Sequence, residues 1–255
     1  MYNLAIYLAE KWRLTNFFVS LLKTKFFNYP PPVIVYQMGK VGSASVIYSI
    51  KKSKRSVFQV HRANLENIQS LRKLTDSKGL RRRVEEPGRY IGKMWNKGKL
   101  RELPLIVLFR SPLQRNLSAF FQNQDYYFKD FNIRSNADFN HLLKMFVRDY
   151  NHNQPVDWIK SELNYFFPEI ILESKIKPFI QKNICILPIE SEDKEKVNLL
   201  NSLLGTSICK IIRKNEAKNK DYHKTYNILS ENVQKNKEIL SLYKNLFNDT
   251  IFHKY

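Results

Sequence analysis

Four short, mainly apolar runs divide the chain, and polar turns and stretches of helical spacing lie between them. The runs span 33–36, 57–60, 105–109 and 184–187. Runs of this length, bounded by turn residues, are typical of strands buried in a sheet. Helical patterns cover 44–52, 112–123 and 192–204, and the prolines at 155, 168 and 178 break the helices predicted over 136–182. A basic tail from Lys210 leads into a last helix that we expect to end near Phe247.

This alternation of strands and helices predicts one α/β domain over residues 30–255, with a parallel central sheet flanked by helices. Ligands of such sheets bind beyond the carboxyl ends of the strands. Residues 1–29 form an N-terminal extension with the spacing of an amphipathic helix, whose apolar side carries Leu4, Leu8, Trp12, Phe18 and Leu22. Two interpretations are open: the helix packs on the core of the domain, or it lies on an anionic membrane surface.

The composition is that of a folded globular protein without a framework of disulfides or zinc-binding cysteines. The 255 residues include 17 Phe and 14 Tyr but only 7 Gly and 2 Cys. Cys185 and Cys209 lie in apolar runs, so we predict that both are buried, reduced thiols. No apolar run reaches the roughly 18 residues of a membrane-spanning helix. We therefore expect a cytoplasmic protein, with at most peripheral contact at the inner face of the membrane.

The chain is strongly basic, with 43 Lys and Arg against 23 Asp and Glu and a net charge of +20. Nucleic acid, a membrane surface, and an anionic small molecule or polysaccharide would all suit such a charge. The sequence contains no recognised nucleic-acid-binding module, and we expect no nucleic-acid partner. The charge alone does not decide between the other two.

The turn after the first predicted strand has the chemistry of an anion-binding loop. Glycines allow the backbone to approach a ligand closely, and the helix that follows offers unpaired N–H groups at its N-terminus. The residues of this turn are Gly39, Lys40, Val41, Gly42, Ser43, Ala44 and Ser45. It is not the loop of Mg²⁺-dependent nucleotide hydrolases, because valine follows the Gly-Lys pair where Ser or Thr is needed. An ordinary strand-to-helix turn with capping serines is the alternative.

A second polar turn follows the strand predicted at 105–109. Arg110 ends the strand, Pro112 opens a helix, and Ser118 lies eight residues after the arginine. An arginine at this position can donate two hydrogen bonds to a phosphate, and a serine one or two turns into the helix can reach the same anion. A salt bridge at the strand end is the alternative for Arg110. We expect Arg115, one turn later, to pair with the ligand or with a neighbouring acid.

With these two turns, the chain resembles the sulfotransferases that use 3′-phosphoadenosine 5′-phosphosulfate (PAPS). The matching segments are Gly-Lys-Val-Gly-Ser-Ala-Ser at 39–45 and Phe-Arg-Ser-Pro-Leu-Gln-Arg-Asn-Leu-Ser at 109–118. More narrowly, it is similar to bacterial capsular polysaccharide synthesis proteins named after an Asn-Lys-Trp-Tyr-Ser motif, where residues 219–222 read Asn-Lys-Asp-Tyr. Asp157, Trp158 and Glu162 fit the pattern of that family. The likeness covers roughly residues 33 to 225.

The resemblance implies a P-loop-like, three-layer fold and a donor site for PAPS. The turn at 39–45 would hold the 5′-phosphosulfate, with Lys40 on the oxygen that bridges sulfate and phosphate. Arg110 and Ser118 would hold the 3′-phosphate. Arg213 and Lys214 occupy the place of a basic loop that covers this phosphate in related enzymes, with a solvated surface as an equal alternative.

The resemblance also implies an enzyme that transfers a sulfuryl group from PAPS to a hydroxyl of a carbohydrate, such as a capsular or cell-surface polysaccharide. His61, just after the second predicted strand, would accept the proton of that hydroxyl; a purely structural histidine is the alternative. Sulfuryl transfer needs no metal, and we expect none. The alternative function is a non-catalytic nucleotide- or glycan-binding module of a polysaccharide synthesis or export system.

Overall fold

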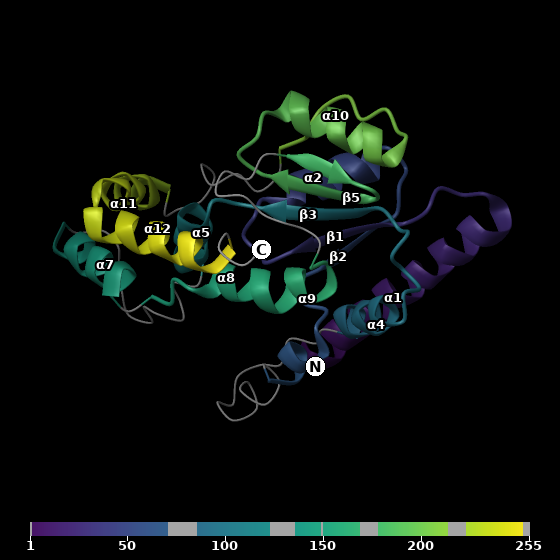
Figure 1. Ribbon diagram of the computed structural model, residues 1–255, viewed down its shortest axis with the longest axis horizontal. Helices are drawn as coiled ribbons and strands as arrows, with labels where there is room; N and C mark the ends of the chain where they lie inside the picture. The colour runs from purple at the N-terminus through teal and green to yellow at the C-terminus, as the bar shows by residue number, and fades with distance from the viewer. Residues whose placement is uncertain are drawn as a thin grey trace.

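The computed structural model describes residues 2–70, 86–122, 136–148, 150–168, 178–213 and 223–251 (Figure 1). In these ranges five strands form one sheet in the order β2-β1-β3-β5-β4. The strands are β1 (Val33–Gln37), β2 (Val57–Val60), β3 (Leu105–Phe109), β4 (Phe179–Gln181) and β5 (Ile184–Pro188). Strands β2, β1, β3 and β5 run parallel to one another, and β4 pairs antiparallel with β5 at the edge of the sheet. The predicted α/β fold with a central sheet and flanking helices is therefore confirmed, and the sheet is parallel as predicted except at β4.

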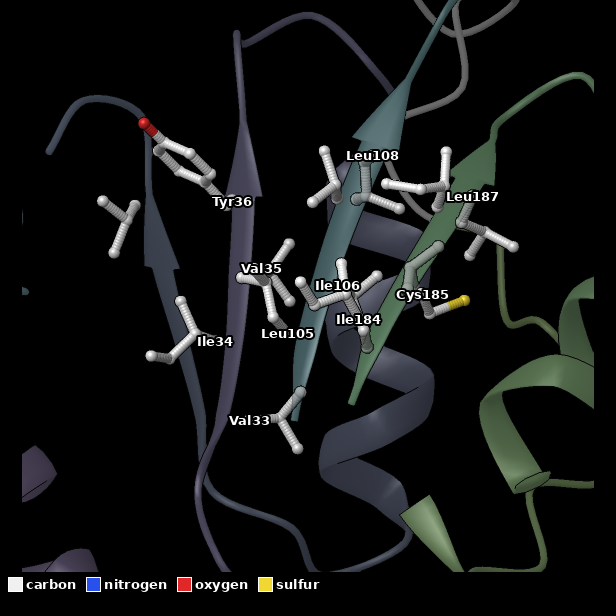
Figure 2. Close-up of a cluster of buried hydrophobic side chains, with 14 of the residues drawn as sticks. Val33, Ile34, Val35, Tyr36, Leu105, Ile106, Leu108, Ile184, Cys185 and Leu187 are labelled. Atoms are coloured by element: carbon white, nitrogen blue, oxygen red, sulfur yellow. The ribbon is translucent and has the colours of Figure 1, made fainter. Parts of the chain in front are cut away.

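The three central strands are buried at every position, which is why they appear in the sequence as unbroken apolar runs. Their side chains project from the two faces of the sheet and belong to one large hydrophobic core (Figure 2). Two helices, α2 (Ser43–Lys52) and α10 (Asp193–Leu204), cover one face of the sheet (Figure 1). The other face is covered by α4 (Glu86–Asn96), α8 (Gln154–Trp158) and α9 (Asn164–Phe166). Helices on both faces satisfy the burial that a parallel sheet requires.

Four further helices pack together around a second apolar core beside the sheet (Figure 1). They are α5 (Pro112–Gln122), α7 (Asn136–Arg148), α11 (His223–Lys235) and α12 (Lys237–Ile251). Phe120, Phe146 and Leu229 are completely or almost completely buried in this core. The prediction of a single last helix is wrong, because the chain breaks at Asn236 into α11 and α12.

Two further predictions from the sequence need correction. The prediction of helices over 136–182 is wrong at residues 179–181, which form the short antiparallel strand β4. Its three residues are only half-buried, and a turn through Lys182 and Asn183 joins it to β5. Both cysteines are free thiols, but only Cys185 is buried, and its burial raises the pKa of the thiol to about 12. Cys209 is exposed, so the prediction of two buried thiols is wrong for that residue.

The N-terminal segment is the long helix α1 (Tyr2–Phe27), but two residues of its predicted apolar side, Trp12 and Leu22, are mostly exposed, whereas the ring of Phe18 lies 4.6 Å from that of Tyr90 on α4. Phe17 is buried, and its ring lies 4.6 Å from that of Phe58 on β2. Within the described ranges, no helix has both the length and the apolar character that a bilayer-spanning segment needs.

Candidate functional site

The order of the strands places both predicted anion-binding turns at one crevice. From β1 the chain passes through α2 to β2 on one side, and then returns to β3 on the other side of β1. β1 and β3 are parallel neighbours, with Gln37 opposite Leu108 near their carboxyl ends. The connections leave these two strands in opposite directions, and this is the position at which α/β sheets bind ligands.

The turn after β1 adopts a backbone conformation that suits close approach to an anion. Gly39, Lys40 and Gly42 have φ values of 86°, 61° and 68°, all in the left-handed region. Such a conformation costs a residue with a side chain roughly 1–2 kcal/mol, so Lys40 is held there by the surrounding structure. Gly42 is the N-cap of α2, whose first turn therefore presents its unpaired N–H groups at the crevice.

The other residues of this turn lie where the sequence places them, at the start of α2. Val41 and Ser45 are buried, whereas Ser43 and Ala44 are half-buried. The hydroxyl of Ser43 accepts hydrogen bonds from the side-chain amides of Gln37 at 2.8 Å and of Gln59 at 3.3 Å. Ser43 therefore belongs to a polar cluster that links the carboxyl ends of β1 and β2.

Gly42 also brings the loop after β5 into the site. A Cβ atom at position 42 would lie 2.9 Å from Cγ1 of Ile189, so the backbone and that side chain are in close contact. The N–H of Ile189 donates to the carbonyl oxygen of Phe109 at 2.8 Å, and the N–H of Ser111 donates to Oε1 of Glu190 at 2.8 Å. The loops after β1, β3 and β5 are thus packed into one unit.

Replacing Gly42 with alanine should destabilise the protein by about 2–4 kcal/mol, because it combines left-handed strain with overlap at Ile189. Gly98 is a matched control: its φ is 70°, but a Cβ atom there would meet no atom within 4 Å. Gly98→Ala should therefore show the backbone strain alone, about 1–2 kcal/mol. Urea denaturation of both variants measures the difference, and equal losses would contradict the close packing at Gly42.

Arg110 joins the turn after β3 to the turn after β1. Its Nη1 donates to the carbonyl oxygen of Lys40 at 3.3 Å, and its Nη2 donates to the hydroxyl of Tyr226 at 3.4 Å. Tyr226 in turn donates to Oε1 of Gln114 at 3.1 Å. These partners are uncharged. Among the described residues, Arg110 therefore does not form the salt bridge at the strand end that was its alternative role. Its positive charge remains available to an anion.

Ser118 lies on α5 one turn beyond Gln114, on the same side of the helix, and is half-buried. Gln114 and Tyr226 extend the predicted pair of Arg110 and Ser118, and neither was singled out from the sequence. Gln114 lies inside the second motif and could have been found by its helical spacing from Ser118. Tyr226 is 116 residues after Arg110, and no local pattern marks it.

A cavity of about 980 Å³ opens beside Arg110. Met38 borders it from the turn after β1, Glu190 from the loop after β5, and Tyr243 and Lys244 from α12. Its size lies at the upper end of the range for small-molecule sites. The cavity is therefore large enough for a nucleotide, and its lining carries charges of both signs. Of the predicted donor-site residues, its lining contains Arg110 but none of the turn at 39–45.

His61 follows β2 directly and lies beside the turn after β1. Its Nδ1 is 3.3 Å from the carbonyl oxygen of Gln37, and its Nε2 is 3.3 Å from the side-chain nitrogen of Gln59. A Cβ atom at Gly39 would lie 3.8 Å from Nδ1 of His61. The imidazole is exposed and lies at the edge of the same crevice.

A buried carboxylate accepts hydrogen bonds from the backbone of the loop that carries His61. Glu162 is completely buried in a π-helical turn (Ile159–Leu163), and its Oε2 accepts hydrogen bonds from the N–H groups of Ala63 at 2.8 Å and Asn64 at 2.9 Å. Trp158 donates from Nε1 to the carbonyl oxygen of His61 at 2.7 Å. Of the three family-pattern residues, Trp158 and Glu162 thus support this loop, whereas Asp157 is exposed.

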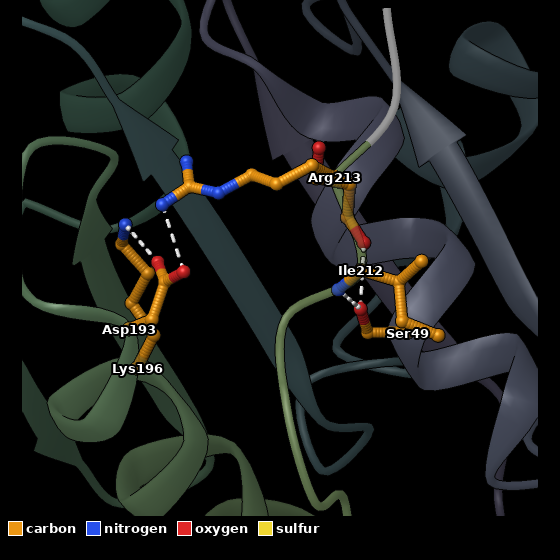
Figure 3. A network of polar contacts seen from close by, with 6 residues as sticks. Ser49, Asp193, Lys196, Ile212 and Arg213 are labelled. Carbon is orange, nitrogen blue, oxygen red and sulfur yellow. Dashed lines mark hydrogen bonds and ion pairs between the residues drawn. The ribbon is translucent and has the colours of Figure 1, made fainter. Parts of the chain in front are cut away.

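Arg213, the described member of the second basic pair, is bound to an acidic side chain. Arg213 donates to Oδ2 of Asp193 at 2.7 Å, and the same carboxylate accepts from Lys196 at 3.1 Å (Figure 3). Lys214 and the segment 219–222 lie outside the described residues. Arg115 is buried and donates to the amide oxygens of Asn116 and Gln154, so the expected acidic or ligand partner is replaced by neutral groups. Burial lowers the pKa of Arg115.

The chain matches no protein-family model, no curated protein and no solved structure. Across the ranges that the structure describes, no three His, Cys, Asp or Glu side chains come together as metal ligands. A functional assignment therefore depends on the geometry of the crevice and on the sequence motifs that form it.

Proposed function

We propose that this protein is a sulfotransferase that moves the sulfuryl group of PAPS to a hydroxyl of a carbohydrate, such as a capsular or cell-surface polysaccharide. The observation that carries the proposal is the 3.3 Å hydrogen bond from Arg110 to the carbonyl oxygen of Lys40. It joins two anion-binding turns that follow neighbouring parallel strands. A nucleotide with phosphates at both ends of its ribose has the charge distribution that such a pair of turns would bind.

In the proposed complex, the turn at 39–45 binds the 5′-phosphosulfate in a P-loop-like manner. The left-handed backbone at Gly39 and Gly42 and the N-terminus of α2 favour an anion there. Arg110 binds the 3′-phosphate together with Ser118, and the hydroxyl of Tyr226, which accepts from Arg110 and donates to Gln114, holds the guanidinium in position. The uncharged partners of Arg110 support this role, because no carboxylate among the described residues has to be displaced from its guanidinium.

The proposed reaction is an in-line displacement at sulfur. The acceptor oxygen forms a bond to sulfur, while the bond from sulfur to the bridging oxygen breaks and its electron pair stays on the departing phosphate. Lys40 offsets the negative charge that develops on that phosphate. His61 accepts the proton of the attacking hydroxyl, an effect worth about 10²–10⁴-fold in rate. The products are a sulfate ester and 3′-phosphoadenosine 5′-phosphate, and no metal takes part.

The acceptor and the location belong to the same proposal. The net charge of +20 would favour an acceptor that already carries negative charge, such as an anionic polysaccharide. The proposed enzyme acts in the cytoplasm, and its two free cysteines suit a reducing compartment.

Arg110→Ala should weaken the binding of 3′-phosphoadenosine 5′-phosphate by about 100-fold, because charge-assisted hydrogen bonds to the 3′-phosphate would be lost. Isothermal titration calorimetry measures the affinity. Arg101→Ala is the matched control, since this exposed arginine precedes β3 at the opposite edge of the sheet. Equal affinity of the unmodified protein for AMP would count against a 3′-phosphate site and thus against the donor.

A further inference from the structure

The side of α1 that faces away from the protein carries a line of exposed apolar residues. Trp12, Val19, Leu22 and Phe26 are exposed by 68%, 40%, 53% and 65%. Their spacings of seven, three and four residues place them along one side of the helix, which we call the apolar ridge. The opposite side contains Phe17, which packs on β2. Helix α1 itself lies at the periphery of the molecule (Figure 1), and its docked position leaves the ridge exposed.

A basic groove runs beside the apolar ridge. Its volume is about 530 Å³, and it lies between α1 and the edge formed by α2 and β2. Arg13, Lys23 and Lys51 line it together with the ridge residues Trp12 and Val19, and no acid is among the lining residues that the structure describes. Apolar and cationic side chains thus meet along one edge of α1.

We propose that the apolar ridge and the basic groove bind the surface of a lipid bilayer that contains anionic lipids. The ridge would enter the boundary between headgroups and acyl chains, and the cations of the groove would meet the anionic headgroups. Lys25 lies 5.5 Å from the ring centre of Phe26, so its charged end can stay at headgroup level while the ring enters the membrane.

Charge and polarity favour a membrane over two other occupants. An anionic polysaccharide would suit Arg13 and Lys23, but it offers nothing to the side chains of Leu22 and Phe26. A second copy of the chain would bring like charges together on both sides of the contact. A bilayer surface supplies negative charge and an apolar layer next to each other, which is the combination that this edge of α1 presents.

Sedimentation of the full chain with lipid vesicles tests the proposal. The protein should sediment with vesicles made of equal parts of phosphatidylcholine and phosphatidylglycerol, but not with vesicles of phosphatidylcholine alone, and added salt should weaken the binding. The double variant Leu22→Ser/Phe26→Ser should lower the partition coefficient by about 10-fold or more. Ile228→Ser is the matched control, because Ile228 on α11 is 51% exposed, close to Leu22, and it should bind as the unmodified protein does.

Equal binding by the double variant and the unmodified protein would overturn the proposal, as would failure of the unmodified protein to bind anionic vesicles at low salt. Sedimentation equilibrium without lipid tests the alternative that the ridge binds a second copy of the chain. A dimer that the double variant abolishes would assign the ridge to a second copy of the chain and reject the membrane. The vesicles contain no sulfate donor, so these outcomes are independent of the proposed enzymatic activity.

Discussion

Lys40→Ala should lower the rate of sulfuryl transfer by about 100- to 1,000-fold, the range seen when one preorganised group that stabilises transition-state charge is removed. The proposed role of Lys40 acts on charge that develops as the bond to sulfur breaks, so donor binding should change much less than the rate. Transfer of radiolabelled sulfate to a panel of glycans at saturating PAPS measures the rate, and calorimetry with 3′-phosphoadenosine 5′-phosphate measures the binding.

Lys54→Ala is a close control for this experiment. Lys54 has a φ of 62°, against 61° for Lys40, and it follows α2 at the end away from the crevice. Any effect of removing a lysine from a left-handed position should therefore appear in both variants, whereas the catalytic effect should appear only at Lys40. A fully active Lys40→Ala enzyme would reject this role. Nucleotide binding without transfer to any glycan would instead favour the non-catalytic module.

The central strands could be predicted because each is buried on both faces, and burial leaves a continuous apolar run in the sequence. Strand β4 left no such run, since its three residues are only half-buried and depend on pairing with β5. The sidedness of α1 was predicted wrongly for a related reason. Apolar residues occur around most of its circumference, so spacing alone did not distinguish Phe17, which docks, from Trp12 and Leu22, which remain exposed.

The candidate site likewise contains local features, which the sequence could predict, and tertiary contacts, which it could not. The turns at 39–45 and at Arg110 could be recognised because glycines, a strand end and a helix start are local features. That the two turns meet follows from the crossover between β2 and β3, which the strand order determines. The roles of Tyr226 and Ile189 depend on tertiary contacts between segments far apart in the chain, and a single sequence carries no local trace of such contacts.

Glu162→Ala should destabilise the protein by about 3–5 kcal/mol, because the variant would leave several buried donors without an acceptor. Oε2 of Glu162 accepts from the hydroxyl of Tyr36 at 2.6 Å, besides the N–H groups of Ala63 and Asn64. Oε1 accepts from the side chain of Asn67 at 2.9 Å. One side chain thus joins β1, the loop that carries His61 and the helix that follows this loop. Urea denaturation measures the loss.

Two further variants show whether the loss of stability comes from the hydrogen bonds of Glu162 or would follow any substitution near this loop. Glu66→Ala removes an exposed carboxylate close to the same loop and should cost less than about 0.5 kcal/mol. Glu162→Gln keeps the shape but turns one acceptor into a donor. With its amide oxygen in the place of Oε2, it keeps the bonds from Ala63 and Asn64 and loses only the bond from Asn67, so its loss of stability should fall between the two. A Glu162→Ala variant no less stable than Glu66→Ala would mean that this network does not hold the loop. In Glu162→Ala protein that folds, we expect slower transfer with unchanged affinity for 3′-phosphoadenosine 5′-phosphate, since the loop that carries His61 would lose two backbone hydrogen bonds while those of Arg110 involve other residues.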